Sequence, residues 1–133
     1  MLGDYKKLPQ TLVDILDKIL DKTKNCDICM LNLAINYGGR AEIIRAVSRA
    51  VKEQISIDCE EDFEKLLYSS GLPPLDFVIR TSGELRISNF MLWQMAYSEL
   101  YFTPTLWPDF SPQELQLALI NYQRRKRRFG KVN

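Results

Sequence analysis

The sequence predicts an α/β domain in which short strands form a parallel sheet and helices pack on it. Three short apolar runs, at residues 28–35, 77–79 and 99–102, alternate with segments whose apolar residues recur at helical spacing. Strands that alternate with helices are usually parallel, because each helix carries the chain back to the same end of the sheet. The 133 residues, 46% of them apolar, are enough for a modest core, so we expect a single domain over residues 1–133.

Composition argues against several classes of function. The 18 Lys and Arg residues against 17 Asp and Glu residues give a net charge of +1, which does not favour a nucleic-acid or membrane partner. No secretion signal and no membrane-spanning apolar stretch occurs, so we expect a reduced, cytoplasmic protein. Cys26 and Cys29 have CxxC spacing, but they cannot complete a zinc site without histidine or a second cysteine pair. Buried thiols are favoured over a redox pair.

Two segments in the first 35 residues are predicted to pack on a core. A helix begins near Pro9, since proline suits the first helical position. Its apolar residues recur on one side, at Leu12, Val13, Leu16, Ile19 and Leu20. Residues 28–35 form a nearly continuous apolar run, which is typical of a strand buried on both faces of a parallel sheet.

A glycine pair in Asn36-Tyr-Gly-Gly-Arg40 precedes the next helix. The pair permits a positive φ or a close backbone approach, so it forms either a tight turn or a phosphate-binding loop, and the turn is favoured. The helix that follows is predicted to bury one apolar face, made of Ile43, Ile44, Val47, Ala50 and Val51. A short helix over residues 58–70 is predicted next, with its apolar side chains inward at Phe63, Leu66 and Leu67.

Residues 75–94 carry the strongest functional signal. A short buried strand at residues 77–79 leads into a polar loop with two arginines, Arg80 and Arg86, and Ser88 can cap a following helix. Guanidinium groups beside a helix N-terminus favour anion binding, because both present N–H donors and positive charge. The alternative is an ordinary strand-to-helix turn with solvated arginines, and the spacing alone does not decide between them.

The remainder of the chain is predicted as helix, strand and helix. A helix over residues 88–97 is apolar nearly all round and is therefore expected to be buried. A strand follows at residues 99–102. Ser111-Pro-Gln-Glu114 is a capping box with proline at the first helical position, which marks the start of a last helix. That helix ends in a basic tail, residues 124–133. About three strands make a thin sheet for these helices, so the apolar faces predict packing against a further partner.

Together these motifs resemble one family, the cis-prenyltransferases, which include bacterial undecaprenyl diphosphate synthase. The matching segments run in order along residues 3–130: Asn36-Tyr-Gly-Gly-Arg40, Asp76-Phe-Val-Ile-Arg-Thr-Ser-Gly-Glu84 with Arg86-Ile-Ser-Asn-Phe90, Glu99-Leu-Tyr-Phe102, Leu106-Trp-Pro-Asp-Phe110 and Arg127-Arg-Phe-Gly130. The resemblance implies the parallel-sheet fold of that family, of which this chain matches the C-terminal half. It also implies Mg²⁺-dependent, cis-selective condensation of isopentenyl diphosphate onto an allylic diphosphate such as farnesyl diphosphate, usually by a homodimer.

The resemblance also implies a substrate site in the loop after residue 79. Arg80, Arg86 and Ser88 would bind the diphosphate of isopentenyl diphosphate. Ile87 lies between two of these ligands and would contribute through its backbone.

Two further roles follow from the same resemblance. Glu99 would be a Mg²⁺ ligand, whereas its position alone fits a solvated carboxylate at a strand end. Arg128 and Gly130 match a motif that in some members reaches the neighbouring active site across the dimer. The alternative for that motif is a frayed, basic helix end.

The chain departs from the family pattern in one important respect. The family's Asp-Gly-Asn-Gly-Arg loop, whose aspartate binds the allylic diphosphate and Mg²⁺, does not occur in these 133 residues, and neither does its Phe-Ser-Ser-Glu-Asn-Trp segment. The groups that would ionise the allylic substrate are therefore missing, whereas those that position isopentenyl diphosphate are present. We expect no turnover by this polypeptide alone, and pairing with a missing N-terminal half or with a second copy.

Two other functions fit the sequence less well. A non-catalytic accessory subunit of a heteromeric cis-prenyltransferase would pair through the dimer surface, but it would not need diphosphate ligands of its own. A nucleic-acid binder built on the basic residues 124–131 is disfavoured by the near-neutral net charge and by the lack of a recognised binding module. The same basic tail is suited to peripheral contact with anionic lipid.

Overall fold

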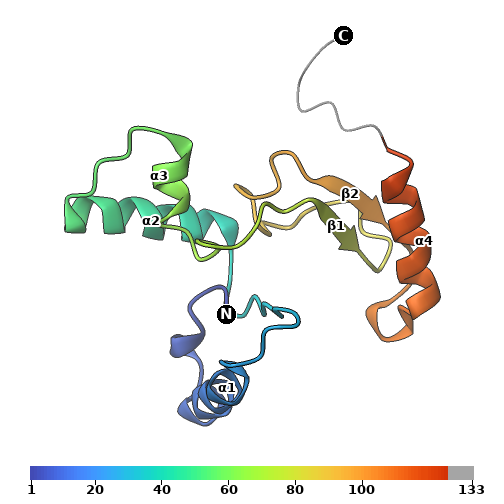
Figure 1. Cartoon of the computed structure of the whole chain (residues 1–133), viewed down its shortest axis with the longest axis horizontal. Helices are drawn as coiled ribbons and strands as arrows, with labels where there is room; N and C mark the ends of the chain where they lie inside the picture. The colour runs from blue at the N-terminus through green and yellow to red at the C-terminus, as the bar shows by residue number, and fades with distance from the viewer. Residues whose placement is uncertain (126–133) are drawn as a thin grey trace. The chain divides into compact units, whose positions relative to one another are not determined.

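The computed structural model describes residues 1–125, and the chain divides into two compact units, Met1–Leu72 and Pro73–Asn133. The first unit contains η1 (Tyr5–Lys7), α1 (Gln10–Thr23), α2 (Gly39–Glu53) and α3 (Glu60–Glu64). The second unit contains β1 (Phe77–Arg80), β2 (Glu99–Phe102), η2 (Trp107–Asp109) and α4 (Pro112–Gln123), as Figure 1 shows. No helix within residues 1–125 has the length and apolar character needed to cross a membrane.

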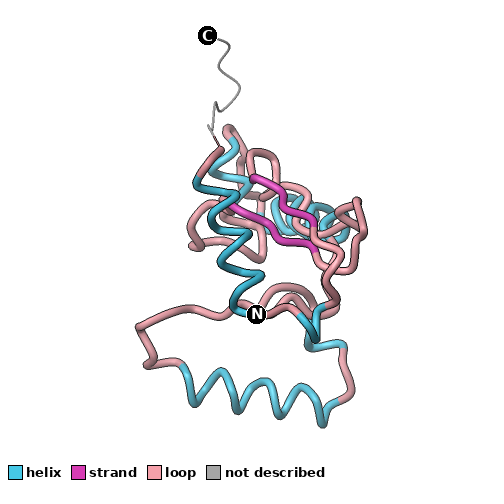
Figure 2. Tube along the Cα trace, turned by 90° about the vertical axis from the view of Figure 1, so that its right-hand side faces the viewer, coloured by secondary structure: helices cyan, strands magenta, loops and turns pink. Residues whose placement is uncertain are grey.

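β1 and β2 form a parallel two-stranded sheet, which confirms the predicted α/β class with a parallel sheet (Figure 2). Phe77 pairs with Glu99 at one end of the sheet, and Arg80 pairs with Phe102 at the other. α4 packs beside β2, and the ring of Tyr122 lies 4.9 Å from that of Phe77, centroid to centroid. Glu99 and Arg80 are therefore at opposite ends of the sheet, about 10 Å apart along the strands.

The last helix starts as the capping box predicts. Pro112 is its first residue, and the Ser111 hydroxyl accepts a hydrogen bond from the backbone N–H of Glu114 at 3.3 Å. The carboxylate of Glu114 turns toward Thr103, whose hydroxyl lies 3.5 Å away. This contact ties the start of α4 to the segment that leaves β2.

The predicted strand over residues 28–35 does not form. Its bridge pairing within the described residues is a single parallel bridge, between Ala34 and Leu2. Ile28 is 98% exposed and Leu31 is 80% exposed, and the thiol of Cys29 is exposed with them. A strand needs a neighbour for its backbone N–H and C=O groups, and an apolar composition does not supply one. The predictions of a doubly buried strand and of buried thiols were therefore wrong.

α1 makes less contact with a core than its pattern predicts. It begins at Gln10, one residue after the predicted Pro9, which lies at the N-cap. Val13 is buried, but Leu12 is 47% exposed and Ile19 is 48% exposed. Most of the predicted apolar face of α1 is thus uncovered within residues 1–125.

α2 forms where predicted, but it buries a neighbouring face. Its buried residues include Glu42, Ala46 and Ala50, whereas Ile44 is 67% exposed and Val51 is 75% exposed. The predicted burial of the apolar stripe was wrong for Ile44, Val47 and Val51, whereas Ala50 is buried and Ile43 is half-buried. The glycine pair before α2 adopts no positive φ, and the first turn closes with a hydrogen bond from the N–H of Glu42 to the carbonyl of Gly38.

A buried carboxylate holds α2 to the segment after α3. Glu42 is 2% exposed, and it accepts hydrogen bonds from the backbone N–H of Tyr68 at 2.7 Å and from the Tyr37 hydroxyl at 2.5 Å. Arg45 donates from Nη2 to the carbonyl of Leu66 at 2.8 Å and lies over the Tyr68 ring. These polar contacts turn Glu42 and Arg45 inward, which is why the apolar pattern indicated the wrong face.

The helix predicted over residues 58–70 is shorter than expected. α3 ends at Glu64, and turns continue the chain toward Gly71. The predicted inward side chains are nevertheless buried: Phe63 is 7% exposed, Leu66 3% and Leu67 4%. The apolar spacing thus identified the core residues of this segment, although it overestimated the length of the helix.

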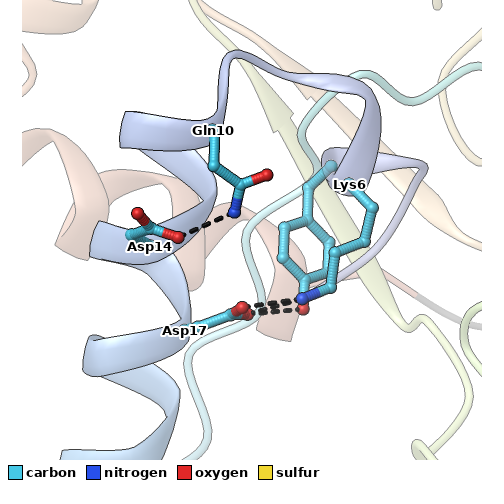
Figure 3. A network of polar contacts seen from close by, with 5 residues as sticks. Lys6, Gln10, Asp14 and Asp17 are labelled. Carbon is cyan, nitrogen blue, oxygen red and sulfur yellow. Dashed lines mark hydrogen bonds and ion pairs between the residues drawn. The ribbon is translucent and has the colours of Figure 1, made fainter.

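Asp17 ties the N-terminal turn η1 to α1 (Figure 3). Its carboxylate accepts hydrogen bonds from the Tyr5 hydroxyl at 3.0 Å and from Lys6 Nζ at 2.7 Å. On the preceding turn of α1, Gln10 donates to Asp14 at 2.8 Å. The hydrogen bond from Lys6 is the main reason why the pKa of Asp17 is lowered from the ordinary 3.8.

Replacing Lys6 by glutamine is expected to raise the Asp17 pKa back toward 3.8, as measured by a carbon-13 NMR titration of the carboxyl group. Because the folded-state pKa lies below the unfolded one, the contact stabilises the fold above about pH 4, and that contribution is lost as the pH falls through the lowered pKa. Lys24→Gln is the control, since Lys24 pairs with Asp21 instead. An unchanged Asp17 titration in Lys6→Gln would contradict the contact.

Candidate functional site

The loop after β1 is fastened to the segment that follows β2. The N–H of Ser82 donates to the carbonyl of Thr105, and the N–H of Gly83 donates to the carbonyl of Thr103, both at 2.8 Å. Ser82 and Gly83 have φ values of 74° and 68°, a region that glycine enters without strain. Thr103 is 3% exposed, so these hydrogen bonds lie against a fixed part of the second unit. The first half of the polar loop is therefore held at the end of the sheet where Arg80 lies.

Three of the predicted substrate-binding residues line one pocket of about 120 Å³: Arg80, Arg86 and Ile87. The rest of the wall is apolar and comes from both strands and the connection between them: Val78, Ile79, Phe90, Met95, Leu100 and Phe102. Guanidinium groups bind anionic oxygens, and an apolar wall accepts hydrocarbon. The pocket can therefore hold a small ligand with one anionic end and one apolar end.

The two pocket arginines differ in their present partners. Arg86 forms an ion pair with Glu84, and the two side chains are 64% and 40% exposed. No ion pair within residues 1–125 engages the Arg80 guanidinium. An exposed ion pair contributes at most about 1 kcal/mol, so a doubly charged anion can displace Glu84 from Arg86. Sequence reasoning missed Glu84 as a competitor, although it lies two residues from Arg86.

The buried helix predicted over residues 88–97 does not form, and turns take its place. Ser88, Asn89 and Met91 have φ values of 47°, 63° and 43°, which interrupt the right-handed helical conformation. Ser88 therefore caps no helix and is exposed, and Tyr97 is 67% exposed. The helix N-terminus that supported the anion-site prediction is absent here. The two arginines predicted for the anion site line the pocket, but no helix dipole supports them. Ser88 does not line the pocket.

Glu99, the predicted Mg²⁺ ligand, forms an ion pair at the other end of the sheet. Its Oε2 lies 2.8 Å from Nη1 of Arg125, and the two side chains are 27% and 30% exposed. Within residues 1–125, no group of three or more His, Cys, Asp or Glu side chains is arranged so that it could hold a metal ion. Mg²⁺ requires a near-octahedral set of oxygen ligands. The described residues thus do not fit a Mg²⁺ ion as they stand.

Two residues of the basic tail prediction, Arg128 and Gly130, lie outside the described residues. Arg125 was predicted only as a member of that tail. Its spacing of four residues from Asn121 is a sequence signal for their hydrogen bond, but no spacing signals the contact with Glu99, which lies 26 positions away.

Comparison with known proteins identifies the class of this chain. The family model described as "Putative undecaprenyl diphosphate synthase" matches residues 1–130. An isoprenyl transferase of Fusobacterium nucleatum is 52% identical over 130 residues, which cover 98% of this chain and 56% of that protein. An isoprenyl transferase of Aquifex pyrophilus is 49% identical over 131 residues, with 98% and 57% covered.

Solved structures agree with the sequence relatives. The crystal structure of lavandulyl diphosphate synthase from Lavandula x intermedia, in complex with dimethylallyl diphosphate, superimposes with a TM-score of 0.90 at 36% identity, covering 98% of this chain and 58% of that one. A probable undecaprenyl diphosphate synthase from Campylobacter jejuni gives a TM-score of 0.84 at 36% identity, with 98% and 61% covered. The fold of this chain is thus that of part of a prenyltransferase-family structure.

The chain is a member of the undecaprenyl diphosphate synthase family of prenyltransferases, as its motifs indicated. It spans a little over half the length of the curated relatives it matches.

Proposed function

We propose that this chain provides the isopentenyl diphosphate site of an isoprenyl transferase, which condenses isopentenyl diphosphate onto an allylic diphosphate with cis stereochemistry. The pocket that joins Arg80 and Arg86 to an apolar wall carries the proposal. Isopentenyl diphosphate has the matching form, with a charged diphosphate at one end and a five-carbon hydrocarbon at the other. Family membership at about half identity over nearly the whole chain supports the same substrate class.

In this proposal the protein positions the acceptor substrate. Arg80 and Arg86 hold the diphosphate through charge-assisted hydrogen bonds, with the backbone of Ile87 and the hydroxyl of Ser88 as further contacts. The apolar wall then fixes the direction of the hydrocarbon, so that its double bond meets the allylic carbon in one orientation. Mg²⁺ would offset the negative charge of a departing diphosphate, but Glu99, which the resemblance makes its ligand, is paired with Arg125 and belongs to no group of side chains within residues 1–125 that could hold a metal ion.

These residues include no aspartate loop that could assist ionisation of the allylic diphosphate. The 133 residues contain no Asp-Gly-Asn-Gly-Arg segment. We therefore expect the purified 133-residue polypeptide to bind isopentenyl diphosphate in calorimetry. It should incorporate no radiolabelled isopentenyl diphosphate when farnesyl diphosphate and Mg²⁺ are added. Labelled polyprenyl product above a no-enzyme blank would contradict this expectation, and absence of binding would contradict the site itself.

A non-catalytic accessory subunit is the second candidate, because exposed apolar side chains on α2 favour a partner. Ile44, Val47 and Val51 are 67%, 48% and 75% exposed along that helix. Such a subunit would raise the incorporation rate of a catalytic partner even after Arg80→Ala and Arg86→Ala. A subunit that supplies the substrate site would lose the effect with those substitutions. Pairing with a second copy is proposed on the same exposed surface, and equilibrium sedimentation measures it directly.

A further inference from the structure

The pocket after β1 has room for only a short hydrocarbon. Its volume is about 120 Å³, and an apolar protein cavity of about 150 Å³ holds one benzene molecule, which has six carbons. The pocket of this chain therefore has space for about five carbons beside its charged groups. A ten-carbon chain needs roughly twice that space, so the size of the pocket can distinguish prenyl groups of different length.

The two strands give the pocket a charged end and an apolar end. Val78 and Arg80 are two residues apart on β1, so their side chains share one face of the sheet. Their strand partners, Leu100 and Phe102, line the same pocket. Two residues of a strand span about 7 Å, so the pair of Val78 and Leu100 lies about that far from Arg80 along the sheet. A ligand whose anionic group is held at Arg80 therefore extends its hydrocarbon toward the N-terminal end of the strands.

Met95 lies at this apolar end. Its carbonyl accepts a hydrogen bond at 3.1 Å from the N–H of Ser98, the residue before β2, and its own N–H donates to the carbonyl of Met91 at 2.9 Å. Because the strands are parallel, the start of β2 lies at the end of the sheet away from Arg80. Met91 is 8% exposed, so the backbone of Met95 is held to the core. Its side chain lines the pocket.

We propose that Met95 is a specificity-determining residue, whose side chain closes the apolar end of the pocket and limits the bound prenyl group to five carbons. This inference rests on the proposed function, because it takes the diphosphate to be held by Arg80 and Arg86. The thioether side chain fills the space into which a longer hydrocarbon would extend. Additional carbons would have to displace that side chain from a packed position or remain in water, whereas a five-carbon group stops short of it.

The length limit can be measured by calorimetry on the full 133-residue chain with three ligands. Isopentenyl diphosphate has five carbons, geranyl diphosphate has ten, and inorganic diphosphate has none. We expect isopentenyl diphosphate to bind about tenfold or more tightly than either of the others, because only its hydrocarbon fills the apolar end without overlap. Met95→Ala should reduce the ratio of the geranyl to the isopentenyl dissociation constant by about tenfold, since further carbons of the geranyl group can then be buried.

Three controls separate the length of the pocket from other effects of the substitution. Met95→Leu keeps a side chain of similar volume and should preserve the ratio. Met30→Ala makes the same change at a 74% exposed position in the other unit and should leave all three dissociation constants unaltered. Inorganic diphosphate tests whether Met95→Ala retains the charged end of the pocket, so its dissociation constant should change by less than about twofold. If the alanine variant does not bind it, Met95→Val removes less volume and should reduce the ratio by about threefold.

An unchanged ratio in a Met95→Ala chain that still binds inorganic diphosphate would overturn the proposal. Equal affinity of the unaltered chain for isopentenyl and geranyl diphosphates would overturn it as well, because no length limit would then exist. A different failure applies to the proposed function: an unaltered chain that binds neither isopentenyl diphosphate nor inorganic diphosphate has no diphosphate site at Arg80 and Arg86, and the length limit is rejected with it.

Discussion

Arg86→Ala is expected to weaken isopentenyl diphosphate binding by about 1.5–3 kcal/mol, or roughly 10- to 150-fold in Kd, as measured by calorimetry. The physical reason is the loss of a charge-assisted hydrogen bond to the diphosphate in a pocket whose lining, apart from Arg80 and Arg86, is apolar. An affinity equal to that of the unaltered chain would show that the Arg86 guanidinium does not contact the ligand.

Two companion variants sharpen this measurement. Glu84→Gln removes the present partner of Arg86, so binding should tighten by less than about 1 kcal/mol, the contribution of an exposed ion pair. Arg49→Ala is the charge-matched control, because Arg49 pairs with Glu53 on the exposed side of α2 and lies in the other unit. A loss of affinity in Arg49→Ala as large as that in Arg86→Ala would indicate a general charge effect instead of a specific contact.

Glu42→Ala is expected to destabilise the first unit by about 2–4 kcal/mol, because it removes a buried carboxylate and leaves two hydrogen-bond donors without their acceptor. The donors are the backbone N–H of Tyr68 and the hydroxyl of Tyr37. Amide hydrogen exchange in α2 measures the effect, with the amides of β1 as an internal reference in the other unit. Exchange in α2 should accelerate by about 30- to 1000-fold if exchange follows unfolding of the unit.

Two variants on the same helix separate burial from charge. Glu42→Gln keeps an acceptor oxygen for Tyr68 and should cost less than the alanine variant. Glu53→Ala removes an exposed carboxylate that pairs with Arg49, so it should change the free energy of unfolding by under about 0.5 kcal/mol. If Glu42→Ala and Glu53→Ala were equally mild, the buried hydrogen bonds of Glu42 would not stabilise α2.

Local sequence signals predicted those parts of the fold that depend on local chemistry. Ser111 and Pro112 specify the start of α4 because capping and a missing N–H are properties of neighbouring residues. The apolar spacing of Phe63, Leu66 and Leu67 likewise predicted their burial. Both strands of the sheet were found because each is a short apolar run between polar turns.

The failures involve features that depend on distant partners. Residues 28–35 have the composition of a buried strand. Strand pairing also requires a neighbouring strand, and composition alone does not predict whether one is present. No sequence pattern singled out Glu42, because a buried carboxylate is favourable only when donors such as the N–H of Tyr68 converge on it from elsewhere in the chain. In the site, the two arginines were predicted from their chemistry. The contact between Arg125 and Glu99 was not, since it joins residues 26 positions apart.

The run of left-handed residues beside the pocket has a thermodynamic consequence. Ser88, Asn89 and Met91 all have positive φ, and each non-glycine residue in that region raises the free energy of the chain by roughly 1–2 kcal/mol, less for asparagine. The segment that follows Arg86 thus adopts a conformation that its backbone disfavours, because non-glycine residues prefer negative φ. A ligand that allowed these three residues to return to negative φ would bind more tightly by that free energy. The affinity of the pocket therefore depends on the conformation of this segment.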